Sequence, residues 1–153
     1  MSTIDCVNAA RTELDELVAS RLRGVGQRVT APRRELVDVL ARAKRPLTIP
    51  ELQQRAPGLA TSSAYRNLGV LEDVGVVHRI VTTDDHARYE LAEDLTEHHH
   101  HLICSVCGGV EDFTAPPALE RALARAVGAV ADDAGFTTNT HRLDLIGTCT
   151  ACA

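Results

Sequence analysis

Four of the five cysteines in this chain fall into two Cys-x-x-Cys pairs, Cys104/Cys107 and Cys149/Cys152. Two such pairs supply the four thiolates that a tetrahedral Zn²⁺ ion needs, and the metal ties together the two ends of the segment that carries them. Two separate redox pairs are the alternative interpretation. Because four thiolates leave no open position on the metal, the spacing predicts a structural zinc. Cys6 stands apart near the N-terminus and is expected to be a free thiol.

The rest of the sequence predicts a reducing environment for these cysteines. No apolar run approaches the length that spans a bilayer, and residues 1–16 lack the basic and apolar regions of a secretory signal. We therefore expect a cytoplasmic protein that does not contact a membrane. Cysteines stay reduced in that compartment, which favours metal ligation over disulfides. Aromatic residues make up only 3% of the chain, so the core must be aliphatic.

Charge is unevenly divided along the chain. Residues 21–66 carry 10 Lys and Arg against 3 Asp and Glu, whereas residues 81–153 carry 4 against 12. A basic segment beside an acidic one predicts one surface for phosphates and another for cations or a partner. Chance scatter of surface charge is the alternative. The net charge of −5 therefore does not exclude nucleic-acid binding.

The first half of the chain has the element order of a winged helix-turn-helix. Helical spacing and capping signals predict helices over residues 3–22, from Thr30-Ala31-Pro32 to about residue 42, from the capping-box pair Thr48 and Glu51, and over 62–74 after a cap at Thr61-Ser62-Ser63. Two β-type runs at 76–82 and 87–91 follow, joined by a polar turn. In such a domain the 62–74 helix enters the major groove of DNA and the hairpin lies along the DNA backbone.

The second half predicts a smaller domain after a polar hinge at 92–97. Apolar runs at 102–106 and 143–146 flank an Ala-rich amphipathic helix over 117–134, with one apolar stripe made of Leu119, Leu123, Val127 and Val130. The fold class is therefore α+β, with a DNA-binding domain over 1–91 and a metal-binding domain over 98–153. A core this small predicts that a bound metal or dimerisation stabilises the domain.

Four consecutive histidines, His98 to His101, directly precede the first cysteine pair. In an extended strand His98 and His100 share one face and His99 and His101 share the other, so one strand could supply ligands to two metal sites. A solvated polar run is the alternative. The remaining nitrogen and oxygen donors available to such sites are His78, His86, Glu90, Asp112, Glu120 and His141.

These features together resemble the ferric uptake regulator (Fur) family over about residues 20–152. The segments that carry the resemblance are Val29-Thr30-Ala31-Pro32-Arg33, Ser63-Ala64-Tyr65-Arg66-Asn67-Leu68, Gly75-Val76-Val77, Arg88-Tyr89-Glu90-Leu91, HHHHLICSVCG at 98–108, and Gly147-Thr148-Cys149. The resemblance implies a homodimeric repressor, not an enzyme, with no small-molecule substrate. It implies a small α/β dimerisation domain and binding to palindromic double-stranded operator DNA when a sensory metal is loaded, which controls metal homeostasis.

The resemblance also implies roles for individual residues. The structural zinc would be held by Cys104, Cys107, Cys149 and Cys152, and the sensory metal by Glu90, His99 and His101, with Asp112 as a further carboxylate. A second site would use His98, His100, His141 and, after a one-residue insertion, Glu120. The expected DNA contacts are Arg28, Arg33, Ser63, Tyr65 and Arg66. For Tyr65 the alternative is a partly buried core residue, and for Arg28 and Arg33 it is solvated surface.

The sequence departs from the family pattern at three positions. Pro46 stands where many iron and peroxide sensors have a histidine in the DNA-binding half. His78 and Ala92 stand where zinc sensors have an aspartate and a cysteine. We therefore hypothesise that His78 supplies the sensory ligand from this half. Its alternative is a wing residue near DNA or solvent, and His86 is expected to be exposed.

The donor set limits the metal and the function. A sensory site of nitrogen and oxygen ligands suits Fe²⁺, which we favour, and also accepts Mn²⁺ or Zn²⁺, so zinc-, manganese- and peroxide-sensing members of the family stay open. A zinc-dependent hydrolase or deaminase would need an open metal position and a general base. Zinc deaminases have His-x-Glu and Pro-Cys-x-x-Cys, and the sequence contains neither. A metal buffer or chaperone using the histidine run is the remaining alternative. It would not need the basic 21–66 segment.

Overall fold

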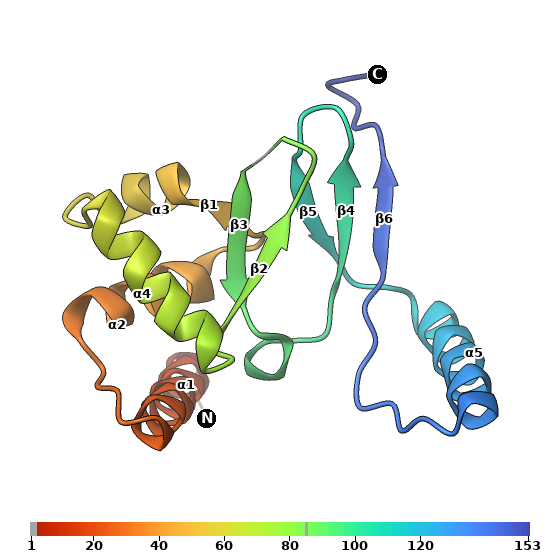
Figure 1. The fold of residues 1–153 in the computed structure, drawn as a ribbon, viewed down its shortest axis with the longest axis horizontal. Helices are drawn as coiled ribbons and strands as arrows, with labels where there is room; N and C mark the ends of the chain where they lie inside the picture. The colour runs from red at the N-terminus through yellow and green to blue at the C-terminus, as the bar shows by residue number, and fades with distance from the viewer. Residues whose placement is uncertain (1–2, 85) are drawn as a thin grey trace. The chain divides into compact units, whose positions relative to one another are not determined.

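A computed structural model describes residues 3–84 and 86–153, with side chains from residue 10 onward outside that gap. The side chain of Cys6, which the sequence predicts to be a free thiol, lies outside the described residues. The chain divides into two compact units, Met1–Glu97 and His98–Ala153 (Figure 1).

The first unit is a winged helix-turn-helix. Its helices are α1 (Thr3–Gly24), α2 (Ala31–Arg42), α3 (Ile49–Arg55) and α4 (Thr61–Asp73), and its strands are β1 (Leu47–Thr48), β2 (Val77–Val81) and β3 (Ala87–Leu91). The strands form an antiparallel sheet in the order β1-β3-β2. The two-residue strand β1 was absent from the sequence prediction, because two residues are too short for a period-2 pattern.

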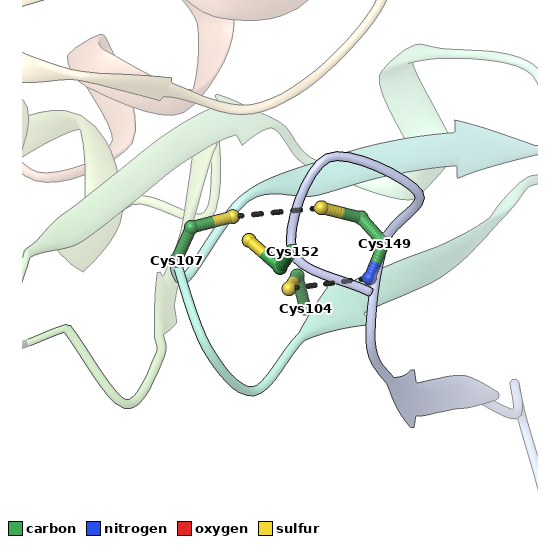
Figure 2. A group of neighbouring side chains, drawn as sticks. All are labelled: Cys104, Cys107, Cys149 and Cys152. Atoms are coloured by element: carbon green, nitrogen blue, oxygen red, sulfur yellow. Dashed lines mark hydrogen bonds between the residues drawn. The ribbon is translucent and has the colours of Figure 1, made fainter.

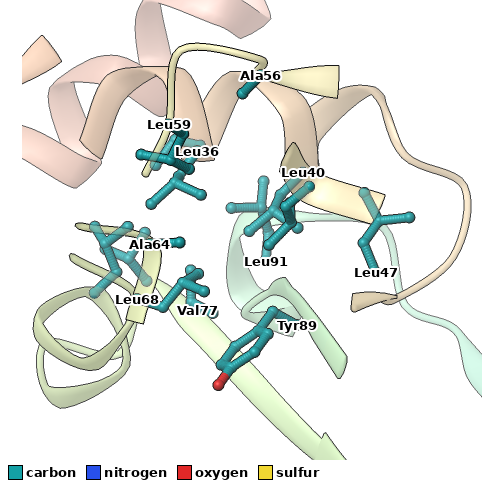
Figure 3. Close-up of a cluster of buried hydrophobic side chains, with 14 of the residues drawn as sticks. Leu36, Leu40, Leu47, Ala56, Leu59, Ala64, Leu68, Val77, Tyr89 and Leu91 are labelled. Atoms are coloured by element: carbon teal, nitrogen blue, oxygen red, sulfur yellow. The ribbon is translucent and has the colours of Figure 1, made fainter. Parts of the chain in front are cut away.

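An aliphatic core holds this unit together, as the composition predicts. Leu36 and Leu40 of α2 pack with Leu68 of α4 and with Leu47 and Tyr89 from the sheet (Figure 3). Leu36, Leu47 and Leu68 have no exposed surface. Burying a leucine side chain contributes roughly 1.5–3 kcal/mol, so this unit has a core of its own that does not involve the four paired cysteines.

Helix caps occupy two of the three positions that the sequence predicts, and one of these two makes the side-chain hydrogen bond. Thr48 and Glu51 form the complete capping box of α3, since the Thr48 hydroxyl accepts from the Glu51 N–H and the Glu51 carboxylate accepts from the Thr48 N–H. Thr30 occupies the N-cap of α2 without a side-chain hydrogen bond. The predicted cap within Thr61-Ser62-Ser63 is wrong, because α4 begins at Thr61 and its N-cap is Ala60.

Removing the α3 cap should weaken the first unit. We expect Thr48→Ala to lower its free energy of unfolding by about 0.5–2 kcal/mol, because an orphan N–H loses its acceptor.

Burial alone would raise the pKa of Glu51, but hydrogen bonds from Arg45 and Thr48 outweigh it and lower that pKa to about 2. The Glu51 contribution should thus be complete above pH 4.5 and lost as pH falls through about 2. Urea unfolding measured between pH 2 and 7 checks the effect of Thr48→Ala and the pH dependence of the Glu51 contribution. Equal free energies of unfolding for Thr48→Ala and wild type would contradict the predicted effect of the substitution.

The segment predicted to be a hinge is attached to the first unit. Residues Glu93–Leu95 form a single 3₁₀ turn, η1. Leu95 packs against the core of the first unit, and the Arg21 guanidinium binds the Asp94 carboxylate and the Gly75 carbonyl. Ala92, Thr96 and Glu97 are the residues of the segment that lie outside this turn.

The second unit is a three-stranded sheet with one helix. Strands β4 (His100–Cys104), β5 (Val110–Phe113) and β6 (Asp144–Gly147) lie in the order β5-β4-β6, with β4 antiparallel to β5 and parallel to β6. Helix α5 covers Pro117–Ala134, as predicted, and ends at Gly135 in the left-handed conformation with φ 64°. No helix among residues 3–84 and 86–153 is long and apolar enough to cross a membrane.

The apolar stripe of α5 is not buried within this chain. Val130 is 70% exposed and Leu119 39%, and Ala131 is the buried residue of the helix. Phe136 after the helix and Ile146 of β6 are also about 70% exposed, at 68% and 71%. The second unit therefore displays apolar side chains that its own sheet does not cover.

Candidate metal centres and nucleic-acid interface

The four cysteines of the two pairs converge at one end of the second unit. Cys104 ends β4, and Cys149 follows β6, the strand beside it (Figure 2). All four sulfur atoms lie within 4.8 Å of one another, and the Cys107 and Cys149 sulfurs are 3.9 Å apart. Tetrahedral ligation with Zn–S bonds of about 2.3 Å would place sulfurs roughly 3.8 Å apart, so the donor set fits Zn²⁺.

Local backbone geometry shapes this cluster. Gly108, with φ 67°, turns the chain after the first pair, and its N–H donates to the Cys104 carbonyl at 2.9 Å. Backbone N–H groups of Cys107 and Cys149 donate to the Cys104 sulfur and lower the pKa of that thiol to about 6. Hydrogen bonds with the neighbouring sulfurs raise the pKa of the Cys152 thiol, and the bond with Cys149 has the largest effect. Thiols this close ionise together when a cation neutralises them, which suits a divalent metal.

One face of the histidine run forms a cluster around a carboxylate from α5. The Nε2 atom of His100 lies 2.7 Å from Glu120, and those of His98 and His141 lie 3.4 Å from it. His100 is fully buried, and its hydrogen bond to Glu120 lowers the pKa of that carboxyl. Three imidazoles that direct their Nε2 atoms at one carboxylate form a donor set that fits a divalent metal.

The opposite face of the run carries His99 and His101. One potential ligand atom from each of these residues and from Asp112 of β5 lies within 4.8 Å of the others. The His101 ring is 3% exposed, and its Nε2 atom lies 3.7 Å from Asp112. The alternation of faces predicted for an extended strand is thus present, although the regular strand begins only at His100.

The remaining sensory candidates lie in the first unit. His78 of β2 and Glu90 of β3 are directly paired across the hairpin, and His78 Nδ1 is 3.2 Å from a Glu90 oxygen. His86 is exposed in the turn. The structure thus brings His78 and Glu90 together, and separately His99, His101 and Asp112.

Helix α4 presents polar side chains to solvent. Tyr65 is 59% exposed, which argues against a core role, and Arg66 is exposed as well. Ser63 is half-buried, and its hydroxyl and carbonyl accept from the Asn67 side chain at 3.1 and 2.8 Å. Arg28 is exposed in the loop before α2. Four of the five predicted DNA contacts are therefore accessible at least in part.

Arg33 corrects the sequence interpretation. It is 8% exposed, and its guanidinium donates to the Asn67 side chain at 3.2 Å and to the Arg28 carbonyl at 2.6 Å. A third bond goes to the Gln27 side chain at 3.0 Å. Arg33 is thus buried, and three of its five N–H groups donate within the first unit, so it is not an exposed phosphate contact in this structure. Arg33 instead joins α2 and the preceding loop to α4 and so positions residues that face solvent.

The matching family model spans residues 24–146 and describes the ferric uptake regulator family. The chain belongs to the ferric uptake regulator family. It is 29% identical over 150 residues to the peroxide-responsive repressor PerR of Staphylococcus aureus, covering 95% of both chains. It is 27% identical to the solved ferric uptake regulator Fur of Helicobacter pylori, with a TM-score of 0.70 and 92% of each chain covered. A zinc-bound manganese uptake regulator matches at 31% identity and a TM-score of 0.61, over 89% of this chain and 98% of that one.

The sequence analysis missed the contacts of two residues, Arg88 and Asp144. Arg88, 7% exposed, donates to Thr82, to both carboxylate oxygens of Asp84 and to the His86 carbonyl, which holds the turn of the wing. Its guanidinium keeps the pKa of Asp84 well below the ordinary range. Asp144 contacts His101 from β6. The spacing of Asp84 and Arg88 could have suggested the first pair, whereas no local signal links Asp144 to His101.

Proposed function

We propose that this member of the family is a metal-responsive transcriptional repressor in the cytoplasm that binds palindromic operator DNA as a homodimer when its sensory metal is loaded. The observation that carries the proposal is one chain that combines an exposed recognition helix with clusters of histidine and carboxylate donors. An enzyme is not proposed, because the family to which the chain belongs is one of regulators, and the four-thiolate cluster offers no open metal position.

The proposed domains are 1–91 for DNA binding and 98–153 for metal binding and dimerisation, with 92–97 between them. Glu90 and His78 from the first domain would join His99, His101 and Asp112 from the second around the sensory metal. A ligand shifts a conformational equilibrium only by its differential affinity for the two states. Ligands drawn from both domains supply that difference, because the metal site is complete only when the domains adopt the DNA-binding arrangement.

His78 contacts another member of this set, Glu90, and this contact is compatible with two roles for His78. It would bind the metal directly, as hypothesised from its position in the sequence, or orient Glu90 through the 3.2 Å hydrogen bond. We propose direct ligation, because the sequence has Pro46 where many family members have a histidine. Replacement by asparagine retains a hydrogen-bonding group but removes the imidazole ligand.

Fe²⁺ is the proposed sensory metal, since the donors are nitrogen and oxygen without thiolate, and Mn²⁺ and Zn²⁺ are the alternatives. A structural Zn²⁺ would occupy Cys104, Cys107, Cys149 and Cys152. A second divalent ion would occupy His98, His100, Glu120 and His141. The Helicobacter relative is described as having three functional metal-binding sites, which supports the same number here.

Dimerisation would cover the apolar surface of the second unit. A groove of about 500 Å³ runs beside α5, and its lining includes Val127, Val130 and Phe136. Contiguous exposed apolar surface of this kind marks an interaction site. A second copy of the chain is the proposed occupant, because a palindromic operator requires two recognition helices related by two-fold symmetry.

Arg66 should contribute to sequence-specific binding. We expect Arg66→Ala to weaken operator binding by about 5–150-fold, equivalent to roughly 1–3 kcal/mol, because an exposed arginine on the recognition helix reaches guanine or phosphate. Arg125→Ala, which removes an exposed arginine from α5, is the matched control. Fluorescence anisotropy with operator and scrambled DNA measures both variants. Equal loss in the two variants would show that Arg66 acts only through net charge.

The proposal is tested by gel-shift binding to the protein's own promoter region. Protein stripped of sensory metal but retaining the structural zinc is titrated in turn with Fe²⁺ under anaerobic conditions, Mn²⁺ and Zn²⁺. Restoration of tight binding by one metal near its cellular free concentration would support the repressor and name its metal. If no metal changes DNA binding while the protein holds several ions, the metal-buffer alternative replaces it.

A further inference from the structure

We propose that Asp144 is a positioning residue for the sensory metal, because it holds the buried His101 ring so that Nε2 faces the ion. The proposal rests on the assignment of His101 to the sensory site and adds a residue outside the ligand set. Asp144 and its neighbour Arg142 contribute no atom to the cluster of His99, His101 and Asp112.

The two nitrogens of the His101 ring face different carboxylates. Nδ1 lies 3.2 Å from an Asp144 oxygen, whereas Nε2 lies 3.7 Å from an Asp112 oxygen. Asp112 belongs to the proposed ligand set, so Nε2 is the nitrogen directed at the metal position. Asp144 therefore lies on the side of the imidazole that faces away from that position.

A carboxylate behind an imidazole selects one tautomer. An ionised carboxylate only accepts hydrogen bonds, so Nδ1 carries the proton that is donated to Asp144. Nε2 then retains its lone pair for the metal. Such outer carboxylates fix ring orientation and raise the basicity of the ligand, and their loss costs about 10–100-fold in metal affinity.

Asp144 is itself held in place from two directions. The Arg142 Nε donates to the same Asp144 oxygen at 3.1 Å, which orients the carboxylate. The backbone of Asp144 is in register with His101, because β6 pairs in parallel with β4. The carboxylate is thus placed by a strand contact and a charge contact rather than by a mobile loop.

The test combines a binding measurement with a measurement on metal-free protein. Co²⁺ affinity is measured by absorption titration of Asp144→Ala and Asp144→Asn, with Asp133→Asn on the exposed face of α5 as matched control. Nitrogen chemical shifts of His101, recorded without sensory metal, report which ring nitrogen carries the proton. Zinc content checks that β6 and the four-cysteine cluster are intact.

We expect Asp144→Ala to weaken Co²⁺ binding by about 10–100-fold and to convert His101 to a mixture of tautomers. Asp144→Asn should lose less, because the amide oxygen still accepts from Nδ1, and the control should match wild type. Unchanged Co²⁺ affinity together with an unchanged Nδ1–H tautomer in Asp144→Ala would overturn the proposal. If His101→Ala leaves Co²⁺ binding intact, the sensory assignment fails instead, and the proposal for Asp144 as a metal-positioning residue falls with it.

Discussion

Replacing Cys149 by serine should remove the structural zinc and unfold the second unit. A structural zinc contributes about 10–16 kcal/mol to the folding of small zinc domains, which exceeds the ordinary stability of a domain. The second unit has few buried apolar residues to compensate, namely Val110, Ala115 and Ala131 besides Cys104. Elemental analysis should show loss of the tightly held zinc, and amide exchange in β4 and β6 should become fast.

The first unit serves as the internal control for this prediction. Its core of Leu36, Leu47, Leu68 and neighbouring residues contains none of the four cysteines. Amide protection in α2 and α4 should therefore persist in Cys149→Ser. The prediction would be wrong if the variant retained zinc with unchanged protection in β4 and β6. Ser105→Ala, close to the cluster but without a sulfur ligand, should keep the metal.

The double substitution His99→Ala/His101→Ala should abolish the metal response of DNA binding. Metal-driven coupling between two sites is typically worth 1–3 kcal/mol, so the activated protein should lose roughly 5–150-fold in operator affinity. The metal-free affinity should be unchanged, because neither residue belongs to the winged helix. Anisotropy titrations with and without the activating metal separate these two quantities.

His86→Ala is the matched control, since His86 is an exposed histidine in the wing turn. It should retain the metal response in full. A second control, His98→Ala/His100→Ala, removes the other face of the run. A double variant of His99 and His101 that still responds to metal would refute the sensory assignment of this face. Equal loss in both double variants would instead indicate that the whole run supports the fold.

Much of the architecture was accessible from local sequence patterns. The boundaries of α5, the hairpin of β2 and β3 and the capping box at Thr48 follow from signals within a few residues. The four-cysteine cluster was predictable because each pair needs only a short turn and the metal chemistry dictates their meeting. The alternation of the four histidines follows from strand geometry alone.

The features that sequence analysis missed depend on tertiary contacts. Strand β1 exists because residues 47 and 48 pair with β3, which no local pattern shows. Arginine is usually a surface residue, yet Arg33 is buried and donates hydrogen bonds to the side chains of Asn67 and Gln27. Asp144 meets His101 across 43 residues of sequence. In each case the partner, and not the residue type, decides the role.

The parallel pairing of β4 and β6 has a consequence for the order in which the protein folds and binds its metals. The Cys104 end of this pairing lies at the four-thiolate cluster, and the His101 end holds Asp144. If zinc occupies the four-cysteine cluster, a newly made chain would need it to bring β6 alongside β4 before the nitrogens of the proposed sensory site acquire their orientation. A cell short of zinc would then contain copies of the protein that cannot respond to the proposed sensory metal, so that the supply of one metal would limit the response to another.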